Sequence, residues 1–367
     1  MDPNLRWGDA ALENRKVNES SRANDTRKAE LLSTTVEHID IRSFDARAII
    51  DAMKKMSFTS RDLGRAAEIY NQMLADRDCS VILVIAGSTS AGGCMDLYAE
   101  LVRNNMVDAI VATGATIVDM DFFEALGHKH YQALEVPDDD TLRSLYIDRI
   151  YDTYIDEEQL QETDHTIGDI ANSLEPKPYS SRAFIREMGK WLMTKGKKEN
   201  SLVKLAYEHD VPIFCPAFVD SSAGFGLVKH QVDAMKAGKP YIVLDAIADF
   251  RELTNLKIEA GTTGLLMIGG GVPKNFTQDT VICAEILGHE DVEVHKYAVQ
   301  ITVADVRDGA CSSSTLREAA SWGKVSSALE QMVFAEATSV LPLLASDAYH
   351  RGYWKDREKR RFARMFD

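Results

Sequence analysis

The chain has 367 residues, of which 45% are hydrophobic, so it can bury a large core as one large domain or two ordinary ones. Its 57 acidic residues outnumber its 42 basic ones, and the formal net charge of −15 is the wrong sign for binding nucleic-acid phosphates. No apolar run reaches the length of a membrane span, and the first residues lack the apolar segment of a signal peptide. We therefore expect a cytoplasmic protein without nucleic-acid or membrane partners.

Helices are predicted at the N-terminal end of the chain. Residues 1–78 are polar at first, and apolar residues then recur every three or four positions within 46–56 and 61–75. Thr59 or Ser60 is expected to cap the second of these helices. We interpret residues 1–78 as an N-terminal helical segment.

Strands and helices alternate after Cys79. Residues 81–86 and 109–113 are predicted strands, each followed by a loop of small residues and a helix, at 97–102 and 118–126. The strand signal then disappears between about 127 and 198, where we predict a helical insertion with helices over 141–153 and 181–193. Residues 195–201 are expected to form an exposed linker.

The α/β alternation resumes after the insertion. Five further strands are predicted at 211–215, 241–244, 265–268, 297–303 and 332–335. This rhythm favours an α/β fold with a mostly parallel, doubly wound sheet that has helices on both faces and ligands at the carboxyl ends of its strands. We place this domain at 79–350 and a basic tail at 351–367, with 355–367 expected to be a solvated amphipathic helix rather than a membrane or partner helix.

A glycine-rich turn follows the strand at 265–268. The stretch GLLMIGGGVPKN at 264–275 leads from apolar residues into three glycines, and a helix is predicted at 279–287. Glycines let the backbone turn sharply and let a ligand approach its N–H groups. Neither a GxGxxG nor a GxxxxGK[ST] motif is present, so a simple tight turn is the alternative.

The loops after the predicted strands are rich in small, hydroxylated and acidic residues. Such loops suit a ribose and a pyrophosphate, with Asp119, Asp220 or Glu336 accepting hydrogen bonds from ribose hydroxyls. Helix capping is the alternative explanation, and residues 312–315 are an obvious cap.

Two lysines are candidates for covalent chemistry. Lys324 follows Trp322, and partly dry surroundings beside a large ring would lower the pKa of its amine, as a Schiff-base lysine needs. A surface lysine after a helix-terminating glycine is the alternative, and Lys274 is the second candidate. Cys311 has no identifiable partner histidine and is expected to be inert. The scattered cysteines and the GHKH pair at 127–130 match no metal-binding pattern, so we predict no metal site.

Three separated motifs, GGGVPKN, DGACSSSTLREAASWGK and AEATSVLPLL, resemble the deoxyhypusine synthase family in the same order. The resemblance runs from about residue 81 to 344, apart from the helical insertion. It implies a Rossmann-like, NAD-binding α/β domain assembled as a homotetramer with active sites at dimer interfaces. It also implies a reaction in which NAD oxidises an amine carbon, a lysine traps the aminobutyl group as an imine, and the same NADH reduces the imine formed with the acceptor amine.

The resemblance also assigns roles by position. Lys324 matches the imine-forming lysine, and Trp322 matches the aromatic residue along the amine substrate. The other substrate positions are Asn275, Gly309, Cys311, Glu318 and Phe225. The NAD positions are Gly87, Ser88, Thr89, Ser90, Ala91, Thr113, Gly114, Ala115, Asp119, Asp220, Gly270, Thr302, Val303, Ala304, Asp308, Glu336 and Ala337.

Three departures from the family pattern change the expected substrate. Asn275 replaces a histidine that would serve as a general base, and Phe225 and Cys311 replace two amine-binding aspartates. The chain therefore looks more like the bacterial deoxyhypusine synthase-like branch, which is associated with polyamines such as homospermidine or its bis-guanidino analogue. We expect Glu318 to engage the substrate cation and Lys324 to have no close carboxylate.

Three hypotheses follow from the sequence. The first is an NAD-dependent aminobutyl or guanidinobutyl transferase that forms a larger polyamine from agmatine, putrescine or spermidine. The second is a true deoxyhypusine synthase that modifies a lysine of a translation factor. The third is a non-catalytic NAD-binding regulator, which the lost histidine permits.

Overall fold

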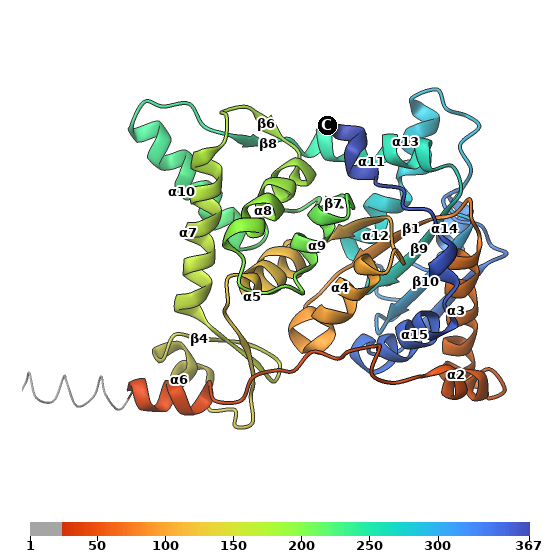
Figure 1. Cartoon of the computed structure of the whole chain (residues 1–367), viewed down its shortest axis with the longest axis horizontal. Coiled ribbons are helices and arrows are strands. Elements are labelled where there is room, and N and C mark those ends of the chain that lie inside the picture. Colours follow the sequence, from red (N-terminus) through yellow and green to blue (C-terminus); the bar gives the residue numbers. More distant parts are fainter. Residues whose placement is uncertain (1–23) are drawn as a thin grey trace, which may run out of the picture.

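A six-stranded sheet forms the centre of the protein (Figure 1). The computed structural model describes residues 24–367, so residues 1–23 of the predicted N-terminal segment lie outside the described part. All neighbouring strands of the sheet are parallel. In spatial order they are β11 (Glu330–Phe334), β10 (Tyr297–Thr302), β9 (Thr263–Ile268), β1 (Ser80–Ile85), β2 (Ala109–Ala112) and β7 (Ile213–Phe214). The predicted mixed α/β fold with a mostly parallel sheet is confirmed.

The chain fills the sheet in two directions from β1. It proceeds through β2 to β7 on one side, and then returns to β9, β10 and β11 on the other side of β1. The strand order therefore reverses between β1 and β9. In open α/β sheets, a crevice forms at this point outside the carboxyl ends of the strands.

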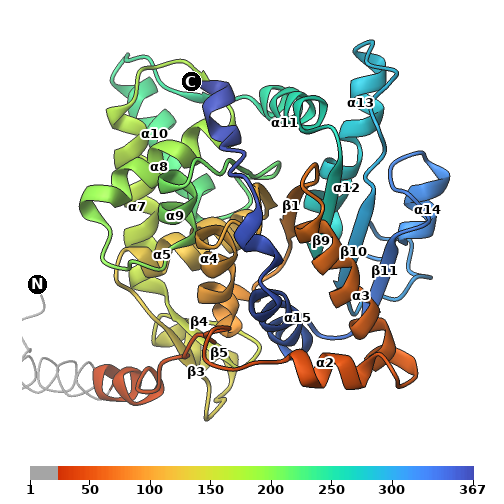
Figure 2. The same ribbon diagram turned by 45° about the vertical axis from the view of Figure 1, so that its right-hand side comes forward.

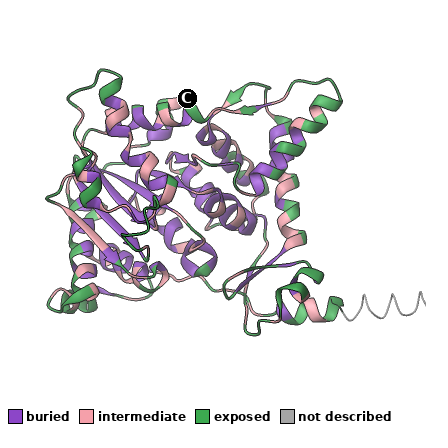
Figure 3. Cartoon of the chain, turned by 180° about the vertical axis from the view of Figure 1, so that it is seen from behind, coloured by how far each residue is buried: buried purple, intermediate pink, exposed green. Residues whose placement is uncertain are grey.

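Both faces of the sheet are buried, because successive side chains of a strand point to opposite faces. Val81, Leu83 and Ile85 of β1 join one hydrophobic cluster, whereas Ile82 and Val84 join another. The helices α3 (Phe58–Ala75), α4 (Met95–Arg103) and α15 (Ala337–Arg351) contribute to the first cluster. The helices α11 (Ala246–Ala260) and α14 (Leu316–Ser321) contribute to the second. Figure 3 shows the central strands in the buried colour and exposed turns on the outlying helices.

The remaining helices surround this core. Residues 24–31 are also helical. The α-helices not yet named are α2 (Arg47–Met53), α5 (Phe123–Ala125), α6 (Asp139–Ser144), α7 (Glu157–Ser173), α8 (Ser181–Lys195), α9 (Leu202–Glu208), α10 (Ser222–Lys236), α12 (Gly271–Gln278) and α13 (Thr280–Ile286). The other helical turns are the π-helical η1 (Ser90–Cys94) and η2 (Ala115–Phe122) and the 3-10 turns η3 (Tyr353–Asp356) and η4 (Phe362–Phe366).

The segment 127–198 contains strands as well as helices, so the prediction of purely helical sequence there is wrong. An antiparallel sheet is formed by β3 (His130–Gln132), β5 (Thr153–Asp156) and β4 (Ile147–Ile150). The helix predicted over 141–153 ends early, because Tyr146 adopts a φ of 55°. Apolar residues of α6, β4 and β5 nevertheless share one cluster, which explains the helix-like spacing. The helix predicted over 181–193 is confirmed as α8.

The strand predicted at 241–244 lies outside the central sheet. Its residues form β8 (Val243–Leu244), which pairs only with β6 (Pro178–Tyr179) in a two-stranded sheet among the described residues. Both strands have only two residues. The apolar run in the sequence predicted a strand at these positions, but it did not indicate which strand would pair with it. The other six predicted strands form the central sheet.

Two details of the terminal predictions are also wrong. Ser57 precedes α3, so Thr59 and Ser60 lie inside its first turn and do not cap it. Residues 355–367 form no continuous helix, because Arg361 adopts a φ of 52° and separates the turns η3 and η4. We call residues 352–367 the C-terminal strap.

The C-terminal strap is anchored to the sheet by a buried ion pair. Arg357 Nη2 lies 2.5 Å from Asp108 Oδ2, and the arginine also donates to the backbone oxygens of Asn105 and Cys79. Burial raises the pKa of Asp108 against the effect of the guanidinium. The basic tail is therefore part of the folded body. Among residues 24–367, no helix is long and apolar enough to cross a bilayer.

Candidate active site

A cavity of about 380 Å³ lies at the point where the strand order reverses. Its walls come from the residues that directly follow β1, β2, β7, β9 and β10, which meet at one edge of the sheet because these strands are parallel. We call it the cradle. Seven predicted cofactor positions line it, namely Gly87, Thr113, Asp220, Gly270, Thr302, Val303 and Ala304.

Glycine is required in the cradle by the close approach of two loops. A Cβ on Gly270 would lie 2.6 Å from Ser312 Cα and 2.7 Å from its carbonyl oxygen, so only glycine fits. The neighbouring Lys274 donates from Nζ to Ser314 O at 2.6 Å and to Ser314 Oγ at 2.8 Å. The loop after β9 and the loop that precedes α14 are therefore held together as one wall.

The remaining predicted cofactor positions do not line the cradle. Ser88, Thr89, Ser90 and Ala91 continue from Gly87 into η1, and Gly114 and Ala115 begin η2. Asp308 is exposed and accepts hydrogen bonds from Ala310 N and Ser313 Oγ. Glu336 caps α15 by accepting from the amides of Thr338 and Ser339, and Ala337 is the first residue of that helix.

Asp119 lies within η2, beside the start of α10. Its Oδ1 accepts a hydrogen bond from Ser222 N at 2.8 Å. Burial raises the pKa of Asp119 to about 6, with the nearby carboxylates of Asp164 and Asp220 acting in the same direction and the hydrogen bonds from Ser222 opposing the shift. A carboxyl group in such surroundings gains from hydroxyl donors that stabilise its charged form.

A second cavity, of about 630 Å³, lies on the other side of the loop wall. We call it the lysine pocket. It is lined by residues of α11, α12, α13 and α14 and of the loop before α14. Figure 2 shows these four helices gathered at one side of the molecule. Ser312 lines the cradle and Ser314 lines the lysine pocket, so the two cavities share one wall. Six predicted positions line this pocket, namely Lys324, Trp322, Asn275, Gly309, Cys311 and Glu318.

Lys324 has an ionic partner that was not predicted. Its Nζ lies 2.5 Å from Asp279 Oδ1 and 3.4 Å from Asn275 Oδ1. The side chain of Lys324 is 12% exposed, and its Nζ lies 5.3 Å from the centre of the Trp322 ring. The expected position beside Trp322 is therefore observed, but the expectation that Lys324 has no close carboxylate is wrong.

Asp279 was missed, although its spacing carries a signal. It follows Asn275 by four residues, and residues four apart lie on one face of a helix. Asn275 Nδ2 donates to Asp279 Oδ2 at 2.8 Å. The position that lacks the expected histidine is therefore linked to a carboxylate, and that carboxylate contacts the candidate nucleophile.

Lys274 has a strongly shifted pKa. Burial lowers the pKa of its amine to about 8, and the Lys324 charge acts in the same direction, whereas Cys311 and Glu318 oppose the shift. Lys274 is 1% exposed, and its Nζ is held by hydrogen bonds to Ser314. Lys274 therefore holds the loop wall from behind and is not among the residues that line the lysine pocket.

Glu318 and Phe225, two predicted substrate positions, lie in different surroundings. Glu318 forms a capping box with Thr315 at the start of α14, and these hydrogen bonds lower the pKa of its carboxyl group. Phe225 lies on α10 and is 69% exposed, and among the described residues it lines neither the cradle nor the lysine pocket. A single copy of the chain therefore places five of the six predicted substrate positions in the lysine pocket with Lys324.

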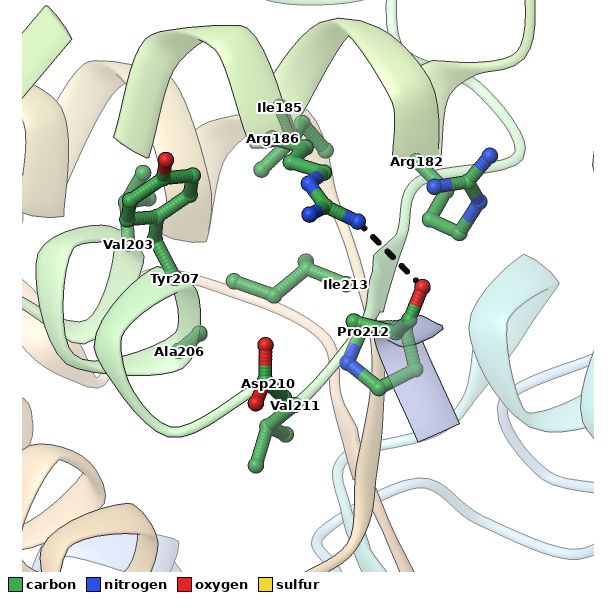
Figure 4. Close-up of a pocket in the computed structure, with 11 residues that line it drawn as sticks. Arg182, Ile185, Arg186, Val203, Ala206, Tyr207, Asp210, Val211, Pro212 and Ile213 are labelled. Carbon is green, nitrogen blue, oxygen red and sulfur yellow. Dashed lines mark hydrogen bonds between the residues drawn. The ribbon is translucent and has the colours of Figure 1, made fainter. Parts of the chain in front are cut away.

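A further cavity, near the C-terminal strap, has a volume of only about 20 Å³ (Figure 4). It lies between α8, α9 and the strap, and Arg186 Nη1 donates to Ala363 O beside it at 3.3 Å. Such a volume holds about one water molecule. This cavity belongs to the anchoring of the strap.

The fold and the two cavities define an α/β protein with a lysine-bearing pocket beside a glycine-walled cradle at the strand ends. The deoxyhypusine synthase family model matches residues 48–348. A deoxyhypusine synthase-like protein of Coxiella burnetii is 72% identical over 340 residues, covering 92% of this chain and 96% of that protein. Another from Caulobacter vibrioides is 67% identical over 356 residues, covering 96% of this chain and 97% of that protein.

More distant relatives agree with this assignment. The probable deoxyhypusine synthase 2 of Methanosarcina mazei is 37% identical over 329 residues, covering 89% of this chain and 92% of that protein. The crystal structure of a putative deoxyhypusine synthase from Entamoeba histolytica shares the fold, with a TM-score of 0.55 at 20% identity, covering 86% of this chain and 97% of that chain. The chain belongs to the deoxyhypusine synthase family, as its motifs predicted, and membership implies a transferase.

Proposed function

We propose that this chain is an NAD-dependent aminobutyl or guanidinobutyl transferase that forms a larger polyamine from agmatine, putrescine or spermidine. The observation that carries the proposal is the shared wall between the cradle and the lysine pocket. A cofactor in the cradle and an amine beside Lys324 would be separated only by the loops that Gly270 and Lys274 hold together. The lysine would carry the transferred group as an imine.

The cradle fits a dinucleotide cofactor. Counted along the chain, the six strands lie in the order 6-5-4-1-2-3, and this order supports the proposed Rossmann-like fold. Gly87 has a φ of 92° and nothing within 4 Å of a built Cβ, and Gly270 adds no side chain of its own to the wall. NAD would be held by the lining residues of the cradle, with Asp220 of this lining and the nearby Asp119 as acceptors for ribose hydroxyls. When bound, NAD would take a hydride from the donor amine carbon and later return it.

The lysine pocket supports a cationic small molecule as substrate. It holds the carboxylates of Asp279 and Glu318 together with the exposed ring of Trp322, which suit ammonium or guanidinium groups. Cys311 lines the pocket where an aspartate stands in protein-modifying members of the family. This loss of an anionic contact favours a small-molecule acceptor over a protein lysine. We propose that the reaction takes place in the cytoplasm.

The active unit is proposed to be a homotetramer. Phe225, Val228, Val232 and Met235 lie along α10 and are 69%, 64%, 39% and 55% exposed. Their spacing of three and four residues places them in one apolar stripe, and the other side of α10 packs against α7 (Figure 1). Such stripes mark interaction sites. A second copy on this stripe would bring Phe225 toward a neighbouring subunit.

Product identification tests the proposal. The pure protein is mixed with NAD and with agmatine, putrescine or spermidine, and the small molecules are analysed by mass spectrometry. A larger polyamine is the expected product. Label that moves from spermidine into a translation factor would instead identify a deoxyhypusine synthase. NAD binding without product, and without borohydride trapping of substrate on Lys324, would identify a non-catalytic regulator.

A further inference from the structure

We infer that Asp279 is a catalytic residue, which carries the proton from Lys324 to the leaving amine while the imine forms. This inference rests on the proposed transfer reaction and supplies the base that Asn275 cannot provide. Its starting point is the contact of 2.5 Å between Lys324 Nζ and Asp279 Oδ1 in the lysine pocket. A general base must lie within hydrogen-bonding reach of the proton that it removes, and Asp279 does.

The position of Asp279 in the chain shows that its carboxylate is not used for helix capping. Asp279 lies between α12 and α13 as the last flanking residue of one helix and the first flanking residue of the other. Aspartate is among the best residues for capping a helix N-terminus, yet this side chain makes no capping hydrogen bond to α13. Both oxygens point into the lysine pocket instead, with Oδ2 fixed by Asn275 and Oδ1 at Lys324.

Asp279 is also accessible to a substrate. Its side chain is 32% exposed and lines the pocket, whereas Lys324 is 12% exposed. The other titratable groups around the pair are Cys283 of α13, Cys311 of the loop, Glu318 of α14 and Lys274 behind the wall, and α11 contributes only the ring of Phe250. Glu318 is engaged by Thr315, so Asp279 is the carboxylate in contact with the nucleophile.

The proposed step begins with an oxidised donor, R–CH=NH⁺–R′, beside the Lys324 ammonium. Asp279 accepts one proton from Nζ while the Nζ lone pair forms a bond to the imine carbon, and the C=N π pair moves to the donor nitrogen. The Asp279 carboxylic acid then donates its proton to that nitrogen while it accepts the second proton from Nζ, and the bond between the donor nitrogen and carbon breaks with the electron pair leaving on R′NH₂. Asp279 finally donates the proton that it now holds to this amine. The products are the Lys324 iminium and R′NH₃⁺, so atoms and charge balance.

An assay with an aldehyde isolates this step from the cofactor. The full-length protein, without NAD or amine, is incubated with butanal and cyanoborohydride across a pH series, and the reduced adduct on Lys324 is quantified by peptide mass spectrometry. Butanal stands in for the oxidised donor, and water is the leaving group. Asp279→Asn should lower the plateau rate of adduct formation by about 10²-fold, the lower range for general acid–base catalysis.

The pH profile distinguishes catalysis from packing. Asparagine keeps the size of the side chain but cannot accept a proton, so the Asp279→Asn rate should stay low at every pH of the series. Asp279→Glu should recover part of the plateau rate. Glu285→Gln is the matched control, because it removes a carboxylate from the exposed side of the same helix, α13, and should leave the profile unchanged.

Each outcome decides a separate question. If the Asp279→Asn profile matches that of the unchanged protein, or if Asp279→Glu recovers none of the lost rate, Asp279 is not the base, although the proposed transfer reaction stands. If the unchanged protein forms no adduct on Lys324, the lysine assignment of the proposed function fails together with this inference.

Discussion

Lys324 and Lys274 lie on either side of one loop wall but have different surroundings. Lys324 faces a cavity and is paired with Asp279, whereas Lys274 is buried behind the wall and paired with Ser314. The strongly lowered pKa belongs to Lys274, the lysine that holds the wall. Geometry and not a shifted pKa therefore identifies the candidate nucleophile here.

Substitution by arginine separates the two lysines. Arginine keeps the charge but cannot form an imine, so Lys324→Arg should retain NAD binding and lose transfer by several orders of magnitude. Lys274→Arg should have a milder effect, because Lys274 only positions the wall. Binding is measured by calorimetry and transfer by the polyamine assay. Normal turnover of the Lys324 variant together with an inactive Lys274 variant would place the nucleophile on the GGGVPKN loop.

The buried amine of Lys274 predicts a pH-dependent stability. Its pKa is lowered to about 8 in the folded chain, against 10.5 for the ordinary side chain, so the folded chain releases this proton first as the pH rises. The Lys274 contribution to the free energy of unfolding should therefore increase by on the order of 2 kcal/mol between pH 8 and pH 10. Lys274→Met should lack this increase in urea unfolding. Equal pH dependence of the two proteins would contradict a buried, shifted amine.

At the scale of single residues, sequence motifs located most of the candidate site. Lys324, Trp322 and Glu318 come together in the lysine pocket as their shared motif implied. Asp279 could not be assigned in the same way, because an aspartate before a helix is ordinarily a cap. Only its three-dimensional contacts show that its carboxylate faces Lys324.

At the scale of elements, the contact between two loops decides the shape of both cavities. Gly270→Ala would place a methyl group 2.6 Å from Ser312 Cα, and backbone atoms cannot move aside as a flexible side chain can. We expect loss of NAD binding and transfer, with a stability cost of about 1–3 kcal/mol from overpacking.

Gly288→Ala is the control for this change. Gly288 has a φ of 91° and nothing within 4 Å of a built Cβ, so alanine there is strained without touching a cavity. It should cost about 1–2 kcal/mol and leave NAD affinity unchanged, as measured by thermal unfolding and calorimetry. Unchanged NAD affinity in Gly270→Ala would show that the wall tolerates the methyl group.

The elements that the sequence located correctly are those whose burial is uniform. β1 and β9 are buried at every position, and such strands have continuous apolar runs. The short strands β4 and β5 alternate with polar residues and follow a helix of the same apolar cluster, so their pattern resembled a helix. The C-terminal strap was misassigned because its basic residues form ion pairs with distant acids, such as Arg357 with Asp108, which no local pattern reveals.

At the scale of the whole molecule, the exposed stripe on α10 predicts assembly. A glutamate in a buried apolar interface is costly unless it is paired, so Val228→Glu should lower the mass measured by light scattering at micromolar concentration. Leu134→Glu changes another exposed apolar residue, 75% exposed, and should leave the mass unchanged. An unchanged mass in Val228→Glu would exclude α10 as the interface, and a monomeric unmodified protein would contradict shared active sites.

The cooperation of the two cavities predicts how the cofactor behaves during turnover. In the proposed reaction, the hydride taken from the donor amine carbon reduces the final imine, so each cycle leaves the redox state of NAD unchanged. Polyamine should therefore accumulate over many turnovers, while absorbance at about 340 nm rises by no more than one NADH per active site, because a retained cofactor is reduced only transiently. The measurement follows absorbance and product in the same sample, with Lys324→Arg as the control that cannot pass the group on. Continued growth of free NADH in proportion to product would make the protein an amine dehydrogenase, because the hydride would then leave with the cofactor instead of returning to the substrate.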